Sequence, residues 1–190
     1  MEGQKAVKET IAPAVAGIEK LIIDPIHSSI GFLVRHMVIS NVRGRFTQFS
    51  GTIFYHRLDI TRSSVTVTID AASVNTENAD RDNDLRSSNF FDTAKFPEIT
   101  FCSRRVEQQC EGYVCVGDLT LHGVIKEIAI PFEITGRQKD PWGKERVGFE
   151  SELKLDRRDF GLTYNALLDN GGLVVGNDIT IDLSIEAVRE

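Results

Sequence analysis

Three acidic residues alternate along the run DRDND, at Asp80, Asp82 and Asp84. Oxygen ligands with this spacing form the first half of a calcium-binding loop. Such a loop also needs a glycine at its sharp turn and a bidentate glutamate at its end, whereas this sequence has Leu85 and Phe91 there. We therefore interpret the run as the solvated acidic face of a short helix.

The histidines are the next candidates for metal binding or acid–base chemistry, at His27, His36, His56 and His122. None belongs to an HExxH or CxxC pattern, which would bring metal ligands together locally, so we predict no metal site. His36 shares one face of a predicted strand with the apolar residues Ile30, Phe32 and Val34. Two roles for His36 stay open, a core-edge residue bonded to a backbone carbonyl and a polar anchor for a bound ligand.

The local signatures of nucleophilic catalysis are missing, since the sequence has neither a GxSxG elbow nor a glycine-rich phosphate loop. The cysteines are Cys102, Cys110 and Cys115, an odd number that leaves at least one without a partner in the chain. This favours a reducing compartment. We interpret Cys102 and Cys115 as core residues, and we predict that the protein is not an enzyme.

Composition excludes several classes of protein. The chain has 190 residues and 41% hydrophobic residues, enough for one globular domain with an apolar core. Its net charge of −6 and the lack of a basic cluster argue against nucleic-acid binding. Arg157 and Arg158 adjoin Asp156 and Asp159, a pattern typical of salt bridges on a rim. Because we find neither a signal peptide nor an apolar run long enough to span a membrane, we expect a cytoplasmic protein without stable membrane insertion.

The elements that must position these residues are mostly strands. Apolar and polar residues alternate with a period of two, which is typical of half-buried antiparallel strands. The sequence predicts about eight of them, at Ile30 to Val38, Arg45 to His56, Ser63 to Ile69, Ile99 to Gln108, Gly112 to Leu121, Glu127 to Gly136, Arg146 to Leu155 and Val174 to Ile185.

Other segments interrupt the strands. Residues Thr76 to Arg86 are at best a short surface helix, residues 140–143 read as a β-turn, and residues 169–172 read as a loop. Pro131 indicates a sheet irregularity or an unpaired position.

The fold class that follows is all-β. Eight strands with one apolar face each either stack as a sandwich or close as a barrel, and closure is slightly favoured because it removes exposed edges. We expect a flexible or partly helical N-terminal arm over residues 1–20 and one β-barrel domain over residues 21–190.

The ordered motifs of the chain resemble those of the YceI-like family. They are IDPIHSSIGFLVRHMVISNVRGRFTQFSGTI from Ile23, SSNFFDTAKFPEITF from Ser87, GDLTLHGVIKEIAIPFE from Gly117, and near the end DFGLTY and VGNDITIDLSIEAV. The resemblance covers about Leu21 to Val188. It implies a lipocalin-like eight-stranded antiparallel barrel, often a homodimer, whose apolar pore binds polyisoprenoid chains or similar amphiphiles.

Family pattern and strand parity together select the expected ligand-binding residues. These are Ile30, Phe32, Val34, His36, Phe46, Val65, Val67, Phe90, Phe91, Phe101 and Phe160. His36, with His27 or Arg35, is expected to orient a polar head group. We expect no covalent cofactor but a bound isoprenoid lipid or quinone, which the barrel sequesters or transports.

Two alternatives stay open. The first is an enzyme that uses His36 as acid or base on an isoprenoid-derived substrate in the same cavity. The second is a ligand-free stress or scaffold protein whose interior is filled by its own phenylalanine side chains.

Overall fold

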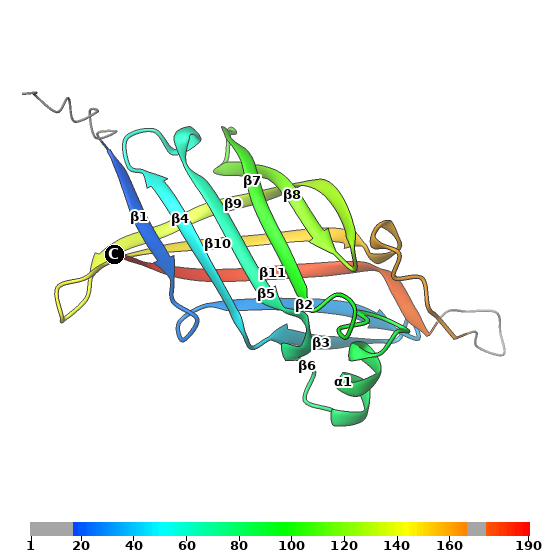
Figure 1. Ribbon diagram of the computed structural model, residues 1–190. Coiled ribbons are helices and arrows are strands. Elements are labelled where there is room, and N and C mark those ends of the chain that lie inside the picture. Colours follow the sequence, from blue (N-terminus) through cyan, green and yellow to red (C-terminus); the bar gives the residue numbers. More distant parts are fainter. Residues whose placement is uncertain (1–16, 167–173) are drawn as a thin grey trace, which may run out of the picture.

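The structure is a computed structural model, described here for residues 17–166 and 174–190. Strands dominate it, and together they form one antiparallel sheet that is elongated along its strands (Figure 1). The strands are β1 (Ile18–Ile23), β2 (Ser29–His36), β3 (Ser40–Phe46), β4 (Phe49–His56), β5 (Ser64–Asp70), β6 (Val74–Asn75), β7 (Glu98–Gln108), β8 (Tyr113–Leu121), β9 (Val124–Lys139), β10 (Glu145–Asp156) and β11 (Val175–Arg189).

The sheet closes because β1 has a partner on each side. Its residues pair with β4 on one side, and Leu21–Ile23 pair with Ala187–Arg189 of β11 on the other. The ring runs β1-β4-β5-β7-β8-β9-β10-β11 and back to β1, which makes eight strands. The predicted eight-stranded antiparallel barrel is therefore confirmed, and the sandwich is excluded.

β11 is long enough to pair with two consecutive strands of the chain. Its end pairs with β1, while its residues Val175–Ser184 pair with β2. Residues 24–28 form the corner between β1 and β2. Beyond β2 the sheet continues through β3 to the short β6, so the barrel forks at this end into a protruding β2–β3 hairpin.

The segment from α1 (Ala79–Arg86) to residue 97 covers the opening beside β6. Leu85 and Phe91 pack there with Phe46, Val74 and Ile99 in one apolar cluster. Within the described residues, no helix is long and apolar enough to cross a membrane.

Polar contacts hold α1 in place, because its sequence offers few apolar side chains. The Asp82 carboxylate accepts hydrogen bonds from the backbone N–H and the hydroxyl of Thr76, at 2.8 and 2.6 Å. Arg86 donates to the carbonyls of Ala72 and Val74. The DRDND run is thus helical, as expected, but Asp82 is buried and anchors the helix instead of facing solvent.

Sequence periodicity missed three strands. β3 contains Arg43 and Arg45 on its outer face and only two apolar inward residues, so its alternation is weak. β6 has two residues. β1 starts at Ile18, inside the segment expected to be a flexible or helical arm, and the rest of that arm lies outside the described residues, as does the loop expected at 169–172.

The expected β-turn is present, and Pro131 has a partner strand on one side only. The turn at residues 140–143 closes with a bond from Gly143 N–H to the Asp140 carbonyl. Pro131 lies in the part of β9 that pairs with β8 before β9 begins to pair with β10 at Glu133, so its missing N–H leaves no gap in the β9–β10 ladder.

The cysteine expectations were half right. Cys115 is buried, and burial raises the pKa of its thiol to about 11. Cys102 was wrongly expected in the core, because its side chain points outward from β7 and is exposed.

We predict that Gly117→Ala destabilises the barrel by about 1–3 kcal/mol, the usual cost of overpacking. A Cβ at Gly117 would lie 2.4 Å from the Cys102 carbonyl oxygen, beside the bulge between Ser103 and Arg105. Urea unfolding measures the change. The matched control is Gly31→Ala, whose Cβ would meet nothing closer than 3.6 Å. Equal stability of the two variants would contradict this account of the bulge.

Candidate functional site

The interior of the barrel holds a cavity of about 320 Å³. Inward-facing residues of all eight ring strands line it, together with residues of β2 and β3, because alternate side chains of a strand point to the same face. It is larger than the engineered apolar cavity of roughly 150 Å³ that stays dry and binds benzene. The cavity is therefore suited to a hydrocarbon guest.

Ten of the eleven residues expected to bind ligand line this cavity. They come from β2, β3, β5, β7, the segment after α1 and the turn before residue 161, and they are Ile30, Phe32, Val34, Phe46, Val65, Val67, Phe90, Phe91, Phe101 and Phe160. Strand parity places the β2 and β5 residues correctly, since every second residue of these strands faces inward.

His36 is the exception and does not line the cavity. It is the last residue of β2 and pairs with Ser40 across the turn and with Val175 on β11. The inward parity was correct, but the strand ends beyond the cavity at this point. His36 therefore has no contact with the space that it was expected to serve.

The other residues expected near a head group lie outside the cavity as well. Arg35 is exposed on the outer face of β2. His27 lies at the corner between β1 and β2, where its Nδ1 is 2.9 Å from Asp24 Oδ2.

Arg157 is a cavity residue that sequence reasoning misinterpreted. It was expected in a salt bridge on a rim, yet it is only 5% exposed and lines the cavity. In the described part of the chain no carboxylate lies within salt-bridge distance of it, whereas Arg158 pairs with Asp156. Two neighbouring arginines in DRRDF thus have opposite environments, which charge alternation alone does not reveal.

Backbone carbonyls hold the Arg157 guanidinium. Nε donates to the Gly176 carbonyl at 2.9 Å, and Nη1 donates to the carbonyls of Leu162 and Tyr164 at 2.5 and 2.9 Å. Burial lowers the pKa of Arg157. We call the part of the cavity lined by Leu155, Arg157, Leu162 and Val175 the Arg157 end. The guanidinium is a desolvated cation beside this apolar space, and its Nη2 makes no hydrogen bond to any described residue. It is covered from the cavity, because no polar atom of the lining has surface open to that space.

Ser151 is a second polar group in the cavity lining. It occupies an inward position of β10, between Phe149 and Leu153 on the same face. Its Oγ is buried and has no hydrogen-bond partner among the described residues. A buried hydroxyl without a partner costs free energy. Its oxygen is covered from the cavity, so the surface that a guest meets here is apolar.

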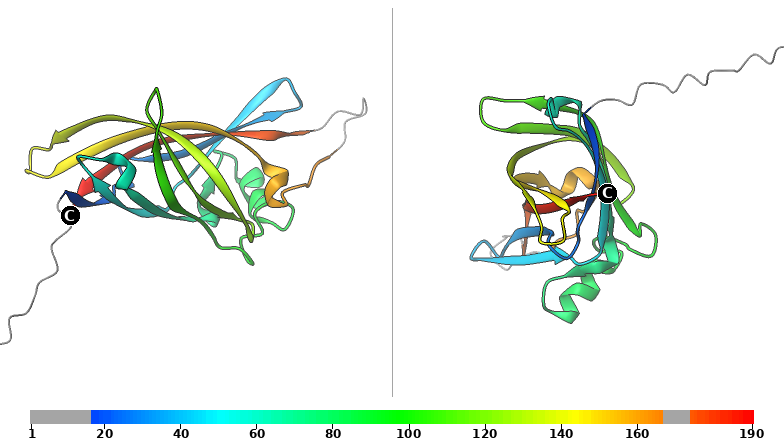
Figure 2. Two further views of the ribbon diagram at one scale, coloured as in Figure 1. Left: turned by 90° about the horizontal axis from the view of Figure 1, so that it is seen from above. Right: turned by 90° about the vertical axis from the view of Figure 1, so that its left-hand side faces the viewer.

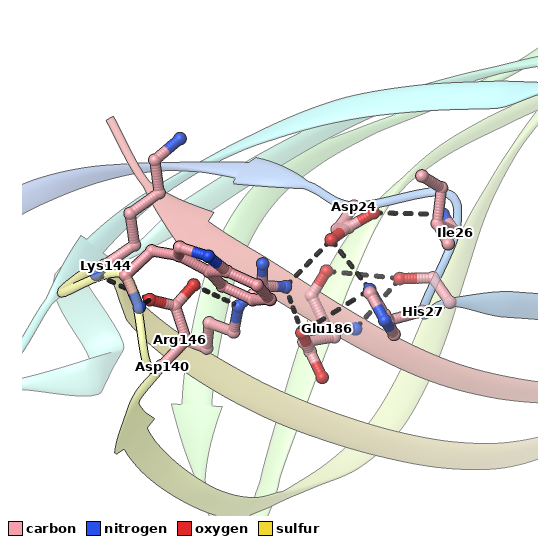
Figure 3. Close-up of polar contacts among 9 residues, drawn as sticks. Asp24, Ile26, His27, Asp140, Lys144, Arg146 and Glu186 are labelled. Atoms are coloured by element: carbon pink, nitrogen blue, oxygen red, sulfur yellow. Dashed lines mark hydrogen bonds and ion pairs between the residues drawn. The ribbon is translucent and has the colours of Figure 1, made fainter.

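A cluster of charged side chains lies outside the cavity, where the β1–β2 corner meets β10 and β11 (Figure 3). Arg146 Nη1 contacts Asp24 Oδ2 at 2.8 Å and also pairs with Glu186, and Arg146 Nε contacts Asp140 at 3.0 Å. Hydrogen bonds from His27 and Arg146 lower the pKa of Asp24.

This cluster contains a set of possible metal ligands, since donor atoms of Asp24, His27 and Glu186 lie within 4.8 Å of one another. However, the Arg146 guanidinium bridges the two carboxylates, and its positive charge opposes a cation at the same place. We interpret the cluster as an ion-pair network that fixes the β1–β2 corner against β10 and β11.

Comparison with known proteins assigns the chain to a protein family. The family model of the YceI-like domain matches residues 21–187. The chain belongs to the YceI-like family. The UPF0312 protein plu2095 of Photorhabdus laumondii is 40% identical over 177 residues, which cover 93% of this chain and 89% of that protein.

Solved structures agree with this assignment. The Campylobacter jejuni YCEI protein superposes with a TM-score of 0.70 at 32% identity, covering 98% of this chain and 99% of that one. A polyisoprenoid binding domain from Saccharophagus degradans has a TM-score of 0.64 at 19% identity, covering 91% of this chain and 99% of that one.

We predict that Arg157→Leu lowers the free energy of unfolding by about 3 kcal/mol or more, because three carbonyls lose a charged donor in a buried place. Urea unfolding followed by circular dichroism measures this. The control is Arg158→Leu, which removes an exposed pair and should leave stability nearly unchanged. If both variants unfold at the same urea concentration, the hydrogen bonds from Arg157 to the three carbonyls do not stabilise the fold.

Proposed function

We propose that this protein binds a polyisoprenoid or similar amphiphilic lipid, such as an isoprenoid quinone, inside the barrel and sequesters or transports it without changing it chemically. The observation that carries the proposal is the cavity of about 320 Å³ with an almost entirely apolar lining. The fold shared with a polyisoprenoid binding domain supports it.

The energetics favour a long apolar guest. Transfer of hydrocarbon from water into an apolar space is worth roughly 0.8 kcal/mol per CH₂ before ordering costs. Aromatic side chains from different strands meet around the cavity, for example Phe32 with Phe46 at 5.9 Å between ring centroids. A chain of isoprene units needs few polar contacts to be held in such a lining.

The polar end of the guest belongs at the Arg157 end of the cavity. A quinone carbonyl or a phosphate oxygen accepts hydrogen bonds, and Arg157 Nη2 donates one only if the side chain turns toward the cavity, from which the guanidinium is covered in this structure. This replaces the head-group role expected of His36, which lies outside the lining.

The enzyme alternative depended on His36 as acid or base. No histidine is among the residues that line the described cavity, so a substrate held there would not meet that group. The alternative of a filled core is also weakened, because Phe32, Phe46 and Phe101 border an open space instead of occupying it. The cytoplasmic location and the homodimer stay predictions.

The direct test is extraction of the purified protein with organic solvent, followed by mass spectrometry. We expect a copurifying isoprenoid or other long-chain amphiphile, since an apolar cavity of this size is costly to leave empty. If repeated extracts hold no lipid and added prenyl quinones do not bind, the proposed function is wrong.

We predict that affinity rises with tail length in a series of quinones that share one head group. The net gain is about 0.3 kcal/mol per atom, or about 1.5 kcal/mol for each five-carbon unit, which is roughly tenfold per unit. The gain should flatten once the tail fills the cavity. Isothermal titration calorimetry measures the series, and an affinity independent of tail length would rule out binding of the tail in the cavity.

We also predict that Phe32→Glu lowers the affinity for the same quinones by at least tenfold or prevents folding, because it introduces an unpaired carboxylate into the apolar lining. The matched control is Arg35→Glu, three residues along β2 on the exposed face, which should bind and melt like the unmodified protein. Equal affinities and melting temperatures for the two variants would show that the assignment of inner and outer faces is wrong.

A further inference from the structure

The turn between β2 and β3 presents three consecutive apolar side chains to solvent. Met37, Val38 and Ile39 are 37%, 74% and 79% exposed. The turn projects beyond the rest of the barrel, as the light-blue hairpin in the left view of Figure 2 shows. Large apolar side chains grouped on a projecting tip mark an interaction site more often than isolated ones do.

The backbone of this turn is unfavourable for the residues that it contains. Met37 and Val38 have φ angles of 52° and 64°, in the left-handed region, and Ile39 N–H donates to the His36 carbonyl across the turn. Asn-Gly is the usual pair for such a hairpin turn, and a β-branched residue is disfavoured. Local stability therefore does not account for apolar residues at these two positions.

The hairpin is basic in an acidic protein. The whole chain has a net charge of −6, yet residues 25–58 contain no aspartate or glutamate. Arg35, Arg43 and Arg45 are exposed on the outer face of β2 and β3, and in the described part of the chain none of them has a carboxylate within salt-bridge distance. The hairpin's own residues thus add only positive charge next to the tip.

Acidic groups do lie on the elements packed against the hairpin. Asp182 on β11 is opposite Gly31, and Glu77 follows β6, whose Asn75 pairs with Arg45. These carboxylates and Glu152 on β10 line one outer groove together with Arg43 and Arg45. Asp178 lies beside Arg35, in the irregular part of β11 between the pairs Val175–His36 and Ile179–Val34. Among the described residues none of these carboxylates is within salt-bridge distance of Arg35 or Arg43, so the two arginines next to the tip keep unpaired positive charge.

The tip adjoins the Arg157 end of the cavity. Met37 N–H donates to the Val174 carbonyl at 2.8 Å, and His36 pairs with Val175, which lines the cavity. Gly176, whose carbonyl binds Arg157, lies against Arg35 across the same strands. Tyr164, which is 47% exposed, packs edge-on against the cavity residue Phe90 at this end.

We propose that the β2–β3 hairpin docks on the surface of an anionic lipid bilayer. Met37, Val38 and Ile39 enter the boundary between head groups and acyl chains, and Arg35 and Arg43 contact the anionic head groups. An apolar tip flanked by cations is the pattern that binds such an interface. The proposal rests on the proposed function, because docking brings the Arg157 end of the cavity to the membrane that supplies or receives the lipid.

The experiment is cosedimentation with vesicles, comparing phosphatidylglycerol–phosphatidylcholine mixtures with phosphatidylcholine alone. We expect the unmodified protein to bind the anionic vesicles, to bind the neutral ones at least tenfold more weakly, and to lose affinity as salt is added. Absence of binding to anionic vesicles, or equal binding to both kinds, would overturn the proposal.

Two variants test the two parts of the surface. The triple variant Met37→Asn, Val38→Gly, Ile39→Thr removes the apolar tip and suits the positive φ angles, so the hairpin should fold, and circular dichroism checks this. It should bind anionic vesicles at least tenfold more weakly. Arg35→Gln with Arg43→Gln should lower the affinity about fivefold for each arginine removed.

Matched controls lie at the other end of the barrel. Leu58→Asn removes a side chain that is 86% exposed, and Arg57→Gln with Arg62→Gln removes two exposed arginines. Each control should change vesicle affinity less than twofold. A control that weakens binding as much as the hairpin variants would overturn the proposal, since attraction would then not depend on the hairpin.

Binding of a short-chain quinone in solution separates this proposal from the proposed function. The tip variants should bind the quinone as the unmodified protein does, because Met37, Val38 and Ile39 do not line the cavity. If the quinone binds and anionic vesicles do not, docking is wrong and the lipid-binding function stands. If vesicle binding depends on the tip but no quinone binds, docking stands and the lipid-binding function is wrong.

Discussion

The pairing of β1 with both β4 and β11 is the constraint on which the rest of the structure depends. It closes eight strands into a ring, so no strand of the ring leaves a full edge unpaired. Closure also forces the inward side chains of all eight strands to face one another across a single space. A ring of eight strands is wide enough for these side chains to line the interior and still leave a cavity.

The corner between β1 and β2 determines where the β2–β3 hairpin leaves the barrel. The change of direction after Ile23 gives β11 two successive partners, and it turns β2 and β3 outward as a hairpin. The network around Arg146 holds this corner against β10 and β11 (Figure 3). Its charges are partly exposed, so its contribution is to orientation more than to stability.

The two ends of the cavity differ chemically, and this difference gives the proposed function a direction. At one end Arg157 is desolvated and bonded to carbonyls, beside a basic hairpin with an apolar tip. The opposite end is lined mainly by apolar and aromatic residues such as Tyr55 and Phe132. We propose that a guest with a polar head and an apolar tail binds with its head toward the hairpin.

The sequence by itself determined the antiparallel β class and ten of the residues around the cavity. Its eight predicted strands include β2 and omit β1, the strand that closes the ring. A period of two assigns faces reliably wherever strands are regular, as in β2 and β5. Only the tertiary structure decided where the cavity stops, which removed His36, and which of two adjacent arginines is buried. Both outcomes depend on β11 crossing beside β2 and the turn before Gly161, contacts between residues far apart in the chain that no local pattern encodes.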